Sequence, residues 1–539
     1  MKDLCGISWR SLFVATVAWS MALCAPAQAQ PLISSNLPII VIEAGRPIPD
    51  SPRVMARMAV IHHGPGQRNR PTDPPTGYDG PIAIEIRGSS SQSFPKKSYA
   101  VELRTTDGQD AQASLLDLPA EEDWIIHGPY SDKSFLRNAL VMHLSNRIGR
   151  YASRTRFVEL VLDGSYEGVY VLMEKVKRDR NRVDIAQLTP DEITGTDLTG
   201  GYILKIDKST GDEFGGWTST FPPRPGSAER VFIQYHYPRP SEITPEQKAY
   251  IQGAVRDFET NLAAFYYADP VLGYNSTIDV DSAIDFILLN ELAKNVDGYR
   301  LSTFLYRDKV RPEVPSPKFV FGPIWDFNLG FGNADYFAGD RPEGFQVESV
   351  VTDTKPPFWF RRLWDERGFR ARASARWGEL RAQIFATDSI TAWIDLAAAQ
   401  LAEAQARDSV RWGNLGVYVW PNPVVWHSRA EETAYLKDWI TRRAAWMDSQ
   451  LIPAVSVEEG PAGSSDPGSV SAYPNPAYAG EWVAVRGDPQ DIAVFDVLGR
   501  RVPVEEAQGG FRVPSTPGMY FLVFATPFGR KTQALLVTR

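Results

Sequence analysis

Two aspartates in the second half of the chain have the spacing of a phosphoryl-transfer site. Asp297 follows an apolar helical segment, 284–292, and Asp326 follows the second strand of a predicted hairpin, 304–306 and 319–321. In phosphoryl transfer one carboxylate orients the attacking hydroxyl, and another holds the Mg²⁺ that bridges the nucleotide phosphates. We assign the first role to Asp297 and the second to Asp326. An aspartate after a strand is also a common turn or helix-cap residue, so their order and joint context carry the argument.

Two polar residues beside these aspartates are weaker candidates for metal ligands. Ser302 lies five residues after Asp297, where protein kinases place a metal-binding asparagine. A hydroxyl is a poorer ligand than a carboxylate for a hard cation. Asn328 stands where a second carboxylate could assist Asp326. Both are predicted metal ligands, and they leave the number of metals open.

A small polar loop in the first half could cover a phosphate group. Arg87 precedes the loop 88–93, which includes Ser89 and Ser90. Backbone N–H groups and small side chains of such loops bind phosphate oxygens. An ordinary polar hairpin loop explains the segment equally well.

The next strand, 97–103, carries a lysine on its apolar face. Lys97 alternates with Tyr99, Val101 and Leu103, and a lysine on an inward face needs a partner. A nucleotide phosphate is one candidate partner and a buried ion pair is the other. We expect Lys96, on the opposite face, to be solvated.

A strand end at 173–176 is the candidate hinge for an adenine ring. Its residues are Met173, Glu174, Lys175 and Val176. Glu174 could instead pair with a lysine. One feature departs from the pattern of protein kinases: the predicted helix 132–149 contains no glutamate that could pair with the lysine of strand 97–103.

The elements that would position these residues are strands first and helices later. Strands are predicted at 81–87 and 97–103, with a hairpin at 157–162 and 166–173. Helical periodicity prevails from about 241 to the amphipathic segment 431–450. This order predicts an α+β body with a sheet-rich N-lobe and a helical C-lobe.

Both ends of the chain indicate export. Residues 1–29 have a basic start, an apolar run of about 14 residues and the ending Ala27-Gln-Ala29, as in a cleavable secretory signal. Both cysteines, Cys5 and Cys24, lie inside this segment, which excludes thiol chemistry and disulfides in the mature chain. The run is too short to span a membrane, so no transmembrane segment is expected in the mature chain. The net charge of −8 argues against nucleic acid as a partner.

The C-terminal tail is predicted to be a separate domain. The body, 30–455, is followed by a Gly/Pro/Ser-rich linker, 456–470, and by short alternating runs over 471–539 that are typical of a small antiparallel β-sandwich. The tail resembles the C-terminal sorting domain of type IX secretion cargo. The similar segments are Tyr473-Pro-Asn-Pro476, Val494-Phe-Asp-Val-Leu-Gly-Arg500, Pro517-Gly-Met-Tyr520 and Leu535-Leu-Val-Thr-Arg539. The resemblance implies the type IX machinery as a partner and the cell surface or medium as the destination.

The body resembles the CotH kinase family of spore-coat atypical kinases. The similar segments are Arg87-Gly-Ser-Ser-Ser91, Phe94-Pro-Lys-Lys-Ser-Tyr99, Gly128-Pro-Tyr-Ser-Asp-Lys-Ser134, Gly164-Ser-Tyr-Glu-Gly-Val-Tyr170, Met173-Glu-Lys-Val176, Gly201-Tyr-Ile-Leu-Lys-Ile-Asp207, Asn295-Val-Asp297 and Trp325-Asp-Phe327, with Trp439-Ile-x-x-Arg442 near the end. The family implies a two-lobed, atypical protein-kinase-like fold that uses ATP and Mg²⁺ to phosphorylate protein serines. Asp297 matches its catalytic-loop aspartate and Asp326 its metal-binding aspartate.

Two other functions stay open. A non-catalytic surface or adhesion protein could keep the fold, which Ser302 and Asn328 favour. The aromatic residues between Trp412 and Trp426 suggest a carbohydrate-handling protein, because aromatic rings stack on sugars, although such rings also fill protein cores.

Overall fold

The computed structural model describes residues 31–452, apart from 210–213, 270, 313 and 350–355, and residues 470–538, apart from 488, 497–498, 508 and 527–528. The predicted signal peptide and nearly all of the predicted linker lie outside the described residues. The described part mixes helices with several sheets, which confirms the α+β class.

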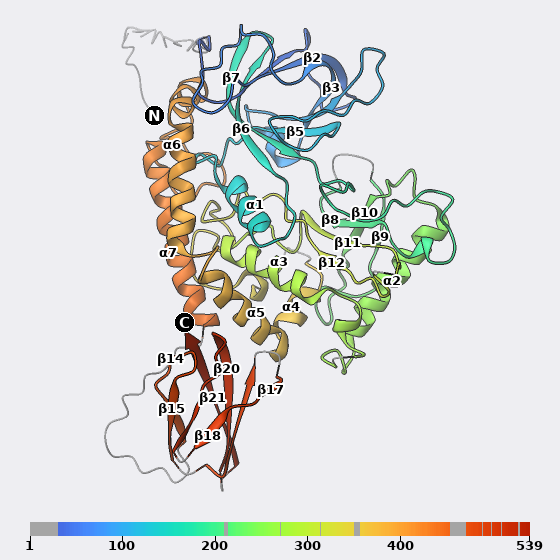
Figure 1. Cartoon of the computed structure of the whole chain (residues 1–539). Helices are drawn as coiled ribbons and strands as arrows, with labels where there is room; N and C mark the ends of the chain where they lie inside the picture. The colour runs from blue at the N-terminus through green and yellow to red at the C-terminus, as the bar shows by residue number, and fades with distance from the viewer. Residues whose placement is uncertain are drawn as a thin grey trace, which may run out of the picture.

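A closed barrel forms the N-terminal part of the body (Figure 1). Around the barrel its strands are β1 (Ile39–Glu43), β2 (Val54–Ile61), β3 (Asp79–Arg87), β4 (Ser98–Leu103), β5 (Asp123–His127), β7 (Ser165–Glu174) and β6 (Thr155–Leu162). Neighbours are antiparallel except β1 and β6, which close the barrel in parallel. Alternate residues such as Ile82 and Ile84 of β3 and Val101 of β4 fill the interior. The predicted strands and the predicted hairpin in this region are confirmed.

A second sheet lies below the barrel in Figure 1. Its strand order is β12 (Val320–Phe321), β11 (Thr303–Arg307), β8 (Tyr202–Ile206), β10 (Phe232–Tyr237) and β9 (Gly216–Thr218). The predicted hairpin is β11 and β12, with Leu305 opposite Phe321. β8 lies between β11 and β10 and pairs with both. The sequence did not predict this position, because β8 is far from β11 in the chain.

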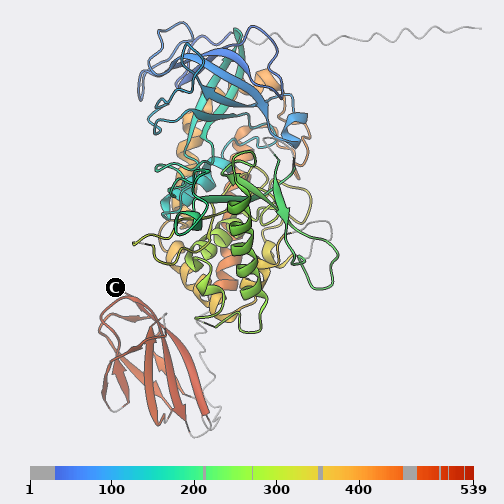
Figure 2. The ribbon, with the colours of Figure 1, turned by 90° about the vertical axis from the view of Figure 1, so that its right-hand side faces the viewer.

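Helices pack against this sheet and along the body (Figures 1 and 2). They are α1 (Arg137–Arg147), α2 (Pro245–Ala263), α3 (Val280–Ala293), α4 (Trp359–Trp364), α5 (Arg367–Arg381), α6 (Thr387–Trp412) and α7 (Arg429–Leu451), with short 3-10 turns at Ser90–Ser93, Asp197–Thr199, Tyr274–Ser276 and Gln346–Glu348. A capping box at Ser428 starts α7 where the sequence predicts a helix. α3 is buried on nearly all sides, and its apolar residues belong to the large core that the helices share with the second sheet.

The helix expected at 132–149 begins later, at Arg137. Asp132 organises a turn before the helix: its carboxylate accepts hydrogen bonds from the backbone N–H groups of Ser134 and Arg137, at 3.2 and 2.9 Å. Phe135 within this turn has a φ of 68°, which a helix does not allow. The carboxylate also pairs with the Arg137 guanidinium at 2.6 Å.

Lys96 contradicts the expectation of a solvated side chain. It is 1% exposed, and its ammonium lies 2.5 Å from the carboxylate of Asp408 on α6. The same carboxylate accepts the backbone N–H of Val169 on β7 at 2.9 Å and pairs with Arg429 at 3.2 Å. Lys96 therefore helps to tie the barrel to α6 and to the start of α7.

The C-terminal residues form two sheets around their own core. The first contains β13 (Ser471–Tyr473), β15 (Trp482–Arg486), β19 (Gly510–Arg512) and β18 (Glu505–Ala507), and the second β14 (Ala477–Tyr478), β21 (Gly529–Thr538), β20 (Gly518–Thr526), β16 (Asp491–Asp496) and β17 (Arg501–Val502). Side chains of both sheets, among them Val483, Phe511 and Leu522, share one buried cluster. The pairing is antiparallel except between β14 and β21. In the part of the chain that the structure describes, no helix combines the length and apolar character needed to cross a membrane.

Candidate active site

A cavity of about 830 Å³ brings together most of the predicted site residues. Its walls come from the β3–β4 loop and β5 and β7 of the barrel, from β8 and from the segments after α3 and β12. The predicted residues that line it are Arg87, Ser89, Ser90, Met173, Lys175, Asp297, Ser302, Asp326 and Asn328.

Three predicted binding residues lie outside this wall. The Lys97 ammonium donates to the backbone oxygens of Gln92 and Phe94, at 2.6 and 2.8 Å. These hydrogen bonds stabilise the end of the polar loop. The partners of Lys97 among the described residues are two carbonyl groups of its own loop and not a buried carboxylate.

Glu174 and Val176 point away from the cavity. Glu174 is fully buried and pairs with Arg154 at 2.6 Å, so its partner is an arginine and not the lysine considered from the sequence. Val176 packs in a small apolar cluster that includes Ile203, and its carbonyl oxygen accepts a hydrogen bond from His236 Nε2 at 2.9 Å.

Asp297 is held by two polar neighbours. Its carboxylate forms an ion pair with Arg300 and accepts a hydrogen bond from the Tyr336 hydroxyl at 3.4 Å. Burial raises the pKa of Asp297, while the cations of Arg300 and Lys208 oppose the rise. The turn that carries it starts at Lys294, which ends α3 with a φ of 43° and whose ammonium donates to the Arg341 carbonyl oxygen at 2.9 Å.

Asp326 occupies a left-handed backbone position, with a φ of 63°. The next residue is anchored, because the Phe327 N–H donates to Asn138 Oδ1 at 2.6 Å. The Asp326 side chain is exposed and lines the cavity. Partial desolvation and the neighbouring carboxylates of Asp297 and Asp207 raise the pKa of Asp326 to about 6.

Asp207 is a third cavity carboxylate that the sequence did not single out as a site residue. Asp207 directly follows β8 and lines the cavity. Because β8 pairs with β11, Ser302, which directly precedes β11, lies beside it, and the Ser302 hydroxyl is 3.5 Å from Asp207 Oδ2. The signal was present: Asp207 closes the segment from Gly201 that carries part of the family resemblance.

Cationic side chains line the same cavity as the carboxylates. Arg87, Lys175, Lys205 and Lys208 line it, and Lys208 donates to the Ser90 hydroxyl at 2.7 Å. The sequence did not single out Lys205 or Lys208 either, because β8, which positions them, pairs with a strand about 100 residues away in the chain. His127 of β5 also lines the cavity, and burial together with the Arg87 charge lowers its pKa to about 4, so its ring is neutral at pH 7.

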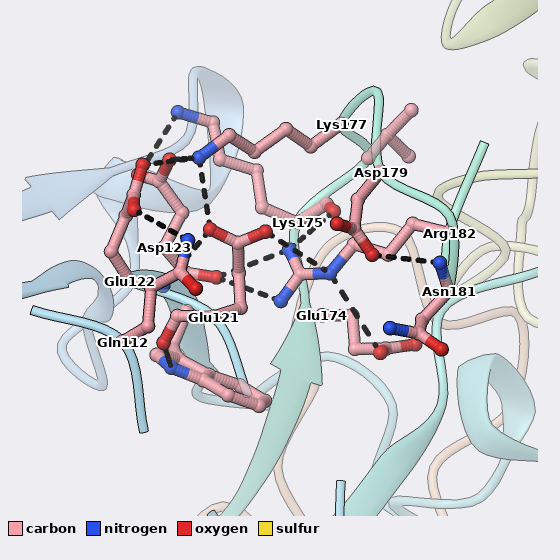
Figure 3. Close-up of polar contacts among 12 residues, drawn as sticks. Gln112, Glu121, Glu122, Asp123, Glu174, Lys175, Lys177, Asp179, Asn181 and Arg182 are labelled. Atoms are coloured by element: carbon pink, nitrogen blue, oxygen red, sulfur yellow. Dashed lines mark hydrogen bonds and ion pairs between the residues drawn. The ribbon is translucent and has the colours of Figure 1, made fainter. Parts of the chain in front are cut away.

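A separate acidic cluster at Glu121, Glu122 and Asp123 has the tightest grouping of candidate metal ligands. Among the described residues it is the one place where three such atoms lie within 4.8 Å of one another. Its charge is already compensated: Lys177 Nζ lies 2.9, 2.5 and 3.0 Å from the three carboxylates (Figure 3). Although burial alone would raise it, the ammonium groups of Lys175 and Lys177 hold the pKa of Asp123 at about 2. The cluster is therefore an internal ion-pair network.

The donor set of the main cavity fits a magnesium ion shared with phosphate groups. Mg²⁺ is typically held by one or two carboxylates plus waters and phosphate oxygens. Asp326 offers one carboxylate beside Asn328, and Asp207 and Asp297 offer two more. Repulsion from Asp297 and Asp207 contributes to the raised pKa of Asp326. A bound divalent cation would relieve this repulsion.

Comparison with known proteins identifies the family. No curated protein matches the chain. The family model described as CotH kinase protein matches residues 84–447, about two thirds of the chain. The matched range contains all the residues that line the cavity except Asp50, Ser51 and Arg53. The chain therefore belongs to the CotH kinase family.

Proposed function

We propose that the protein is a kinase that transfers the γ-phosphate of ATP to serine hydroxyls of a protein substrate. The observation that carries the proposal is the meeting of Asp207, Asp297 and Asp326 with Arg87, Lys205 and Lys208 in one cavity. The cavity combines carboxylates for a metal and a hydroxyl with cations for phosphate oxygens, and these are the parts that phosphoryl transfer requires. Family membership supports the same activity.

The proposed reaction uses Asp297 to receive a proton. The serine oxygen forms a bond to the γ-phosphorus, the bond from that phosphorus to the β–γ bridging oxygen breaks, and ADP leaves. The serine proton passes to the Asp297 carboxylate, which the Arg300 ion pair and the Tyr336 hydrogen bond orient. Mg²⁺, when bound, would neutralise charge on the β- and γ-phosphates.

The other cavity residues receive binding roles. Asp326, with Asn328 and Asp207, would hold the metal, and Ser302 would keep Asp207 oriented through their 3.5 Å contact. The list of proposed nucleotide contacts is Arg87, Ser89, Ser90, Lys205 and Lys208 for the phosphates and Met173 and Lys175 for the base. In this proposal Lys97, Glu174 and Val176 support the walls from outside and touch no ligand.

We also propose that the barrel and the helical part are the two lobes of an atypical kinase-like fold. The cavity lies where residues of the barrel meet β8 and the segments after α3 and β12, as the nucleotide site of a two-lobed kinase would. The order of the parts along the chain agrees with this division.

The location of the protein is a further part of the proposal. The signal-like residues 1–29 and the sorting-domain resemblance of residues 471–539 favour secretion or display at the cell surface, with the type IX machinery as a partner. A fusion of residues 471–539 to a periplasmic reporter tests the second step, since the reporter should reach the surface only in cells with that machinery.

Activity is tested by incubating the purified mature chain with labelled ATP, Mg²⁺ and cell-surface proteins. We expect label on serine in the wild type and none in Asp326→Ala. Asp395→Asn, which changes an exposed carboxylate of α6, is the matched control and should keep full transfer. ATP binding without transfer would favour the non-catalytic surface protein, and binding of oligosaccharides alone would favour carbohydrate handling.

A further inference from the structure

An exposed group of aromatic side chains adjoins Asp297 at one side of the cavity. We call it the aromatic shelf; it consists of Tyr336, Phe337, Tyr418 and Trp420. Tyr336, Phe337 and Trp420 line the cavity together with Asp297. Tyr418 and Trp420 keep 54% and 50% of their surface exposed. Large aromatic surface left open beside reactive groups is typical of a ligand site.

The shelf is firmly built. Tyr336 and Trp420 stack with their planes 4° apart and their centroids 6.0 Å apart. The Tyr418 hydroxyl donates to Asp335 at 2.8 Å, and the Asp335 N–H donates to the Pro421 carbonyl oxygen at 2.9 Å. These contacts join the segment after β12 to the connection between α6 and α7.

Buried polar groups fix that connection behind the shelf. Lys133 donates to the Val417 carbonyl oxygen at 2.6 Å. Asn422, which is 4% exposed, donates to the Ser131 carbonyl oxygen at 2.8 Å and to Asn333 Oδ1 at 2.9 Å. The backbone is thus held from the inside while the aromatic side chains face outward. This arrangement preorganises a surface for binding at little entropic cost.

We propose that the aromatic shelf binds a large apolar side chain of the acceptor polypeptide, within two residues of the serine that receives the phosphate. The inference rests on the proposed kinase function, and it names the substrate feature that the site selects.

Distance along a polypeptide sets the position of that side chain. Tyr336 both contacts the Asp297 carboxylate, at 3.4 Å, and stacks on Trp420, so the shelf begins directly beside the residue that would receive the serine proton. Two residues of an extended chain span about 7 Å. A serine at Asp297 therefore places a side chain one or two positions away over Tyr336 and Trp420.

The charged groups beside the shelf are Asp297, Asp335 and Arg300, whose guanidinium pairs with Asp297 and lies 5.6 Å from the centre of the Phe337 ring. Arg87, Lys205 and Lys208 are among the other cations that line the cavity. The hydroxyls of Tyr336 and Tyr418 already donate to Asp297 and Asp335, which leaves the ring faces as the main surface that the shelf offers. An apolar side chain is satisfied by ring faces alone, which favours a polypeptide over a glycan.

The test uses serine peptides that differ only in one flanking residue. Labelled transfer is measured for peptides with Phe, Leu or Ala at each position within two residues of the serine, and their binding without ATP is measured by fluorescence anisotropy. We expect a large apolar side chain at one of these positions to raise kcat/KM about tenfold or more over Ala. Trp420→Ala should abolish this preference, and Trp420→Phe should restore part of it. Tyr478→Ala, which removes an exposed aromatic residue of the C-terminal sheets, should leave it intact.

The outcomes separate the inference from the function on which it rests. Transfer to serine without any apolar preference, or a preference that survives in Trp420→Ala, would overturn the inference and leave the kinase proposal standing. Absence of both ATP binding and transfer would overturn the two together. Oligosaccharide binding that Trp420→Ala removes, with peptides unaffected, would assign the shelf to glycans and overturn the inference as well.

Discussion

Removing one member of the buried pair of Arg443 and Glu291 should destabilise the body by several kilocalories per mole. Both side chains are fully buried, on α7 and α3, and their charged groups lie 3.0 Å apart. Arg443 also donates to the carbonyl oxygens of Glu291, Pro342 and Gly344, at 2.7, 2.6 and 2.7 Å. Burial raises the pKa of Glu291 and lowers that of Arg443 to about 10, which marks the desolvation that both charges bear.

Replacing Arg443 with Met keeps most of the volume and removes the charge. Glu291 would retain its hydrogen bonds from Tyr299 and from the backbone of the 3-10 turn at Gln346, but it would lose its cation. Breaking one side of a buried ion pair typically costs about 3–5 kcal/mol. Because α3 leads directly into the turn that carries Asp297, we expect phosphate transfer to fall as well.

The neighbouring arginine provides the matched control. Arg442 is 51% exposed, and its ion pair with Asp438 is a surface contact between residues four apart on α7. Arg442→Met should cost about 0.5 kcal/mol or less. The assay is urea unfolding of the mature chain, followed by tryptophan fluorescence.

The double variant Arg443→Met/Glu291→Leu should recover part of the lost stability: no buried charge is left unpaired, but the Tyr299 hydroxyl and the N–H groups of Gln346 and Val347 lose their acceptor. Equal and small losses for Arg442→Met and Arg443→Met would refute the reasoning.

Three further predictions concern other polar groups. Burial raises the pKa of Glu259 from 4.5 to about 7, so the wild type should lose about 2.5 kcal/mol of stability between pH 5 and pH 8 and Glu259→Gln should not; urea unfolding of both proteins at both pH values measures the difference. Lys96→Met should lower the free energy of unfolding by about 3 kcal/mol or more, since it leaves Asp408 buried without its closest cation. Asp207→Asn should weaken Mg²⁺-dependent ATP binding by about tenfold in calorimetric titration, because it removes one carboxylate from the cavity.

Each of these predictions has a matched comparison. Glu242→Gln changes an exposed glutamate and keeps Glu259, so its stability should fall between pH 5 and pH 8 as in the wild type; a wild type that loses no more stability than Glu259→Gln over this range would contradict the first prediction. Lys437→Met removes a surface ion pair and should cost far less than Lys96→Met. Unchanged ATP affinity in Asp207→Asn would exclude that carboxylate from the metal site.

The sequence predicted the convergence of Asp297 and Asp326 because the hairpin between them is local. β11 and β12 are close in the chain and pair directly, so the two segments that flank them must approach each other. Asp207 escaped because β8 reaches the sheet through pairing across about 100 residues, and no local pattern reports such pairing.

The two lysines before β4 show a different limit. Alternation assigns faces only within a strand, and β4 begins at Ser98. Lys96 and Lys97 precede it, where the chain turns: Lys96 reaches Asp408 on α6, and Lys97 reaches the carbonyl groups of its own loop. The partner of Lys96 lies 312 residues away, which a strand pattern cannot indicate.

The central claim is that the cavity binds ATP together with Mg²⁺ through Asp326. Calorimetric titration of ATP into the mature chain, with Mg²⁺ and with EDTA, tests it most directly. We predict saturable binding in the presence of Mg²⁺ that EDTA or Asp326→Ala weakens at least tenfold, while Asp395→Asn leaves it unchanged. Absence of ATP binding in the wild type, or equal binding in Asp326→Ala, would contradict the claim.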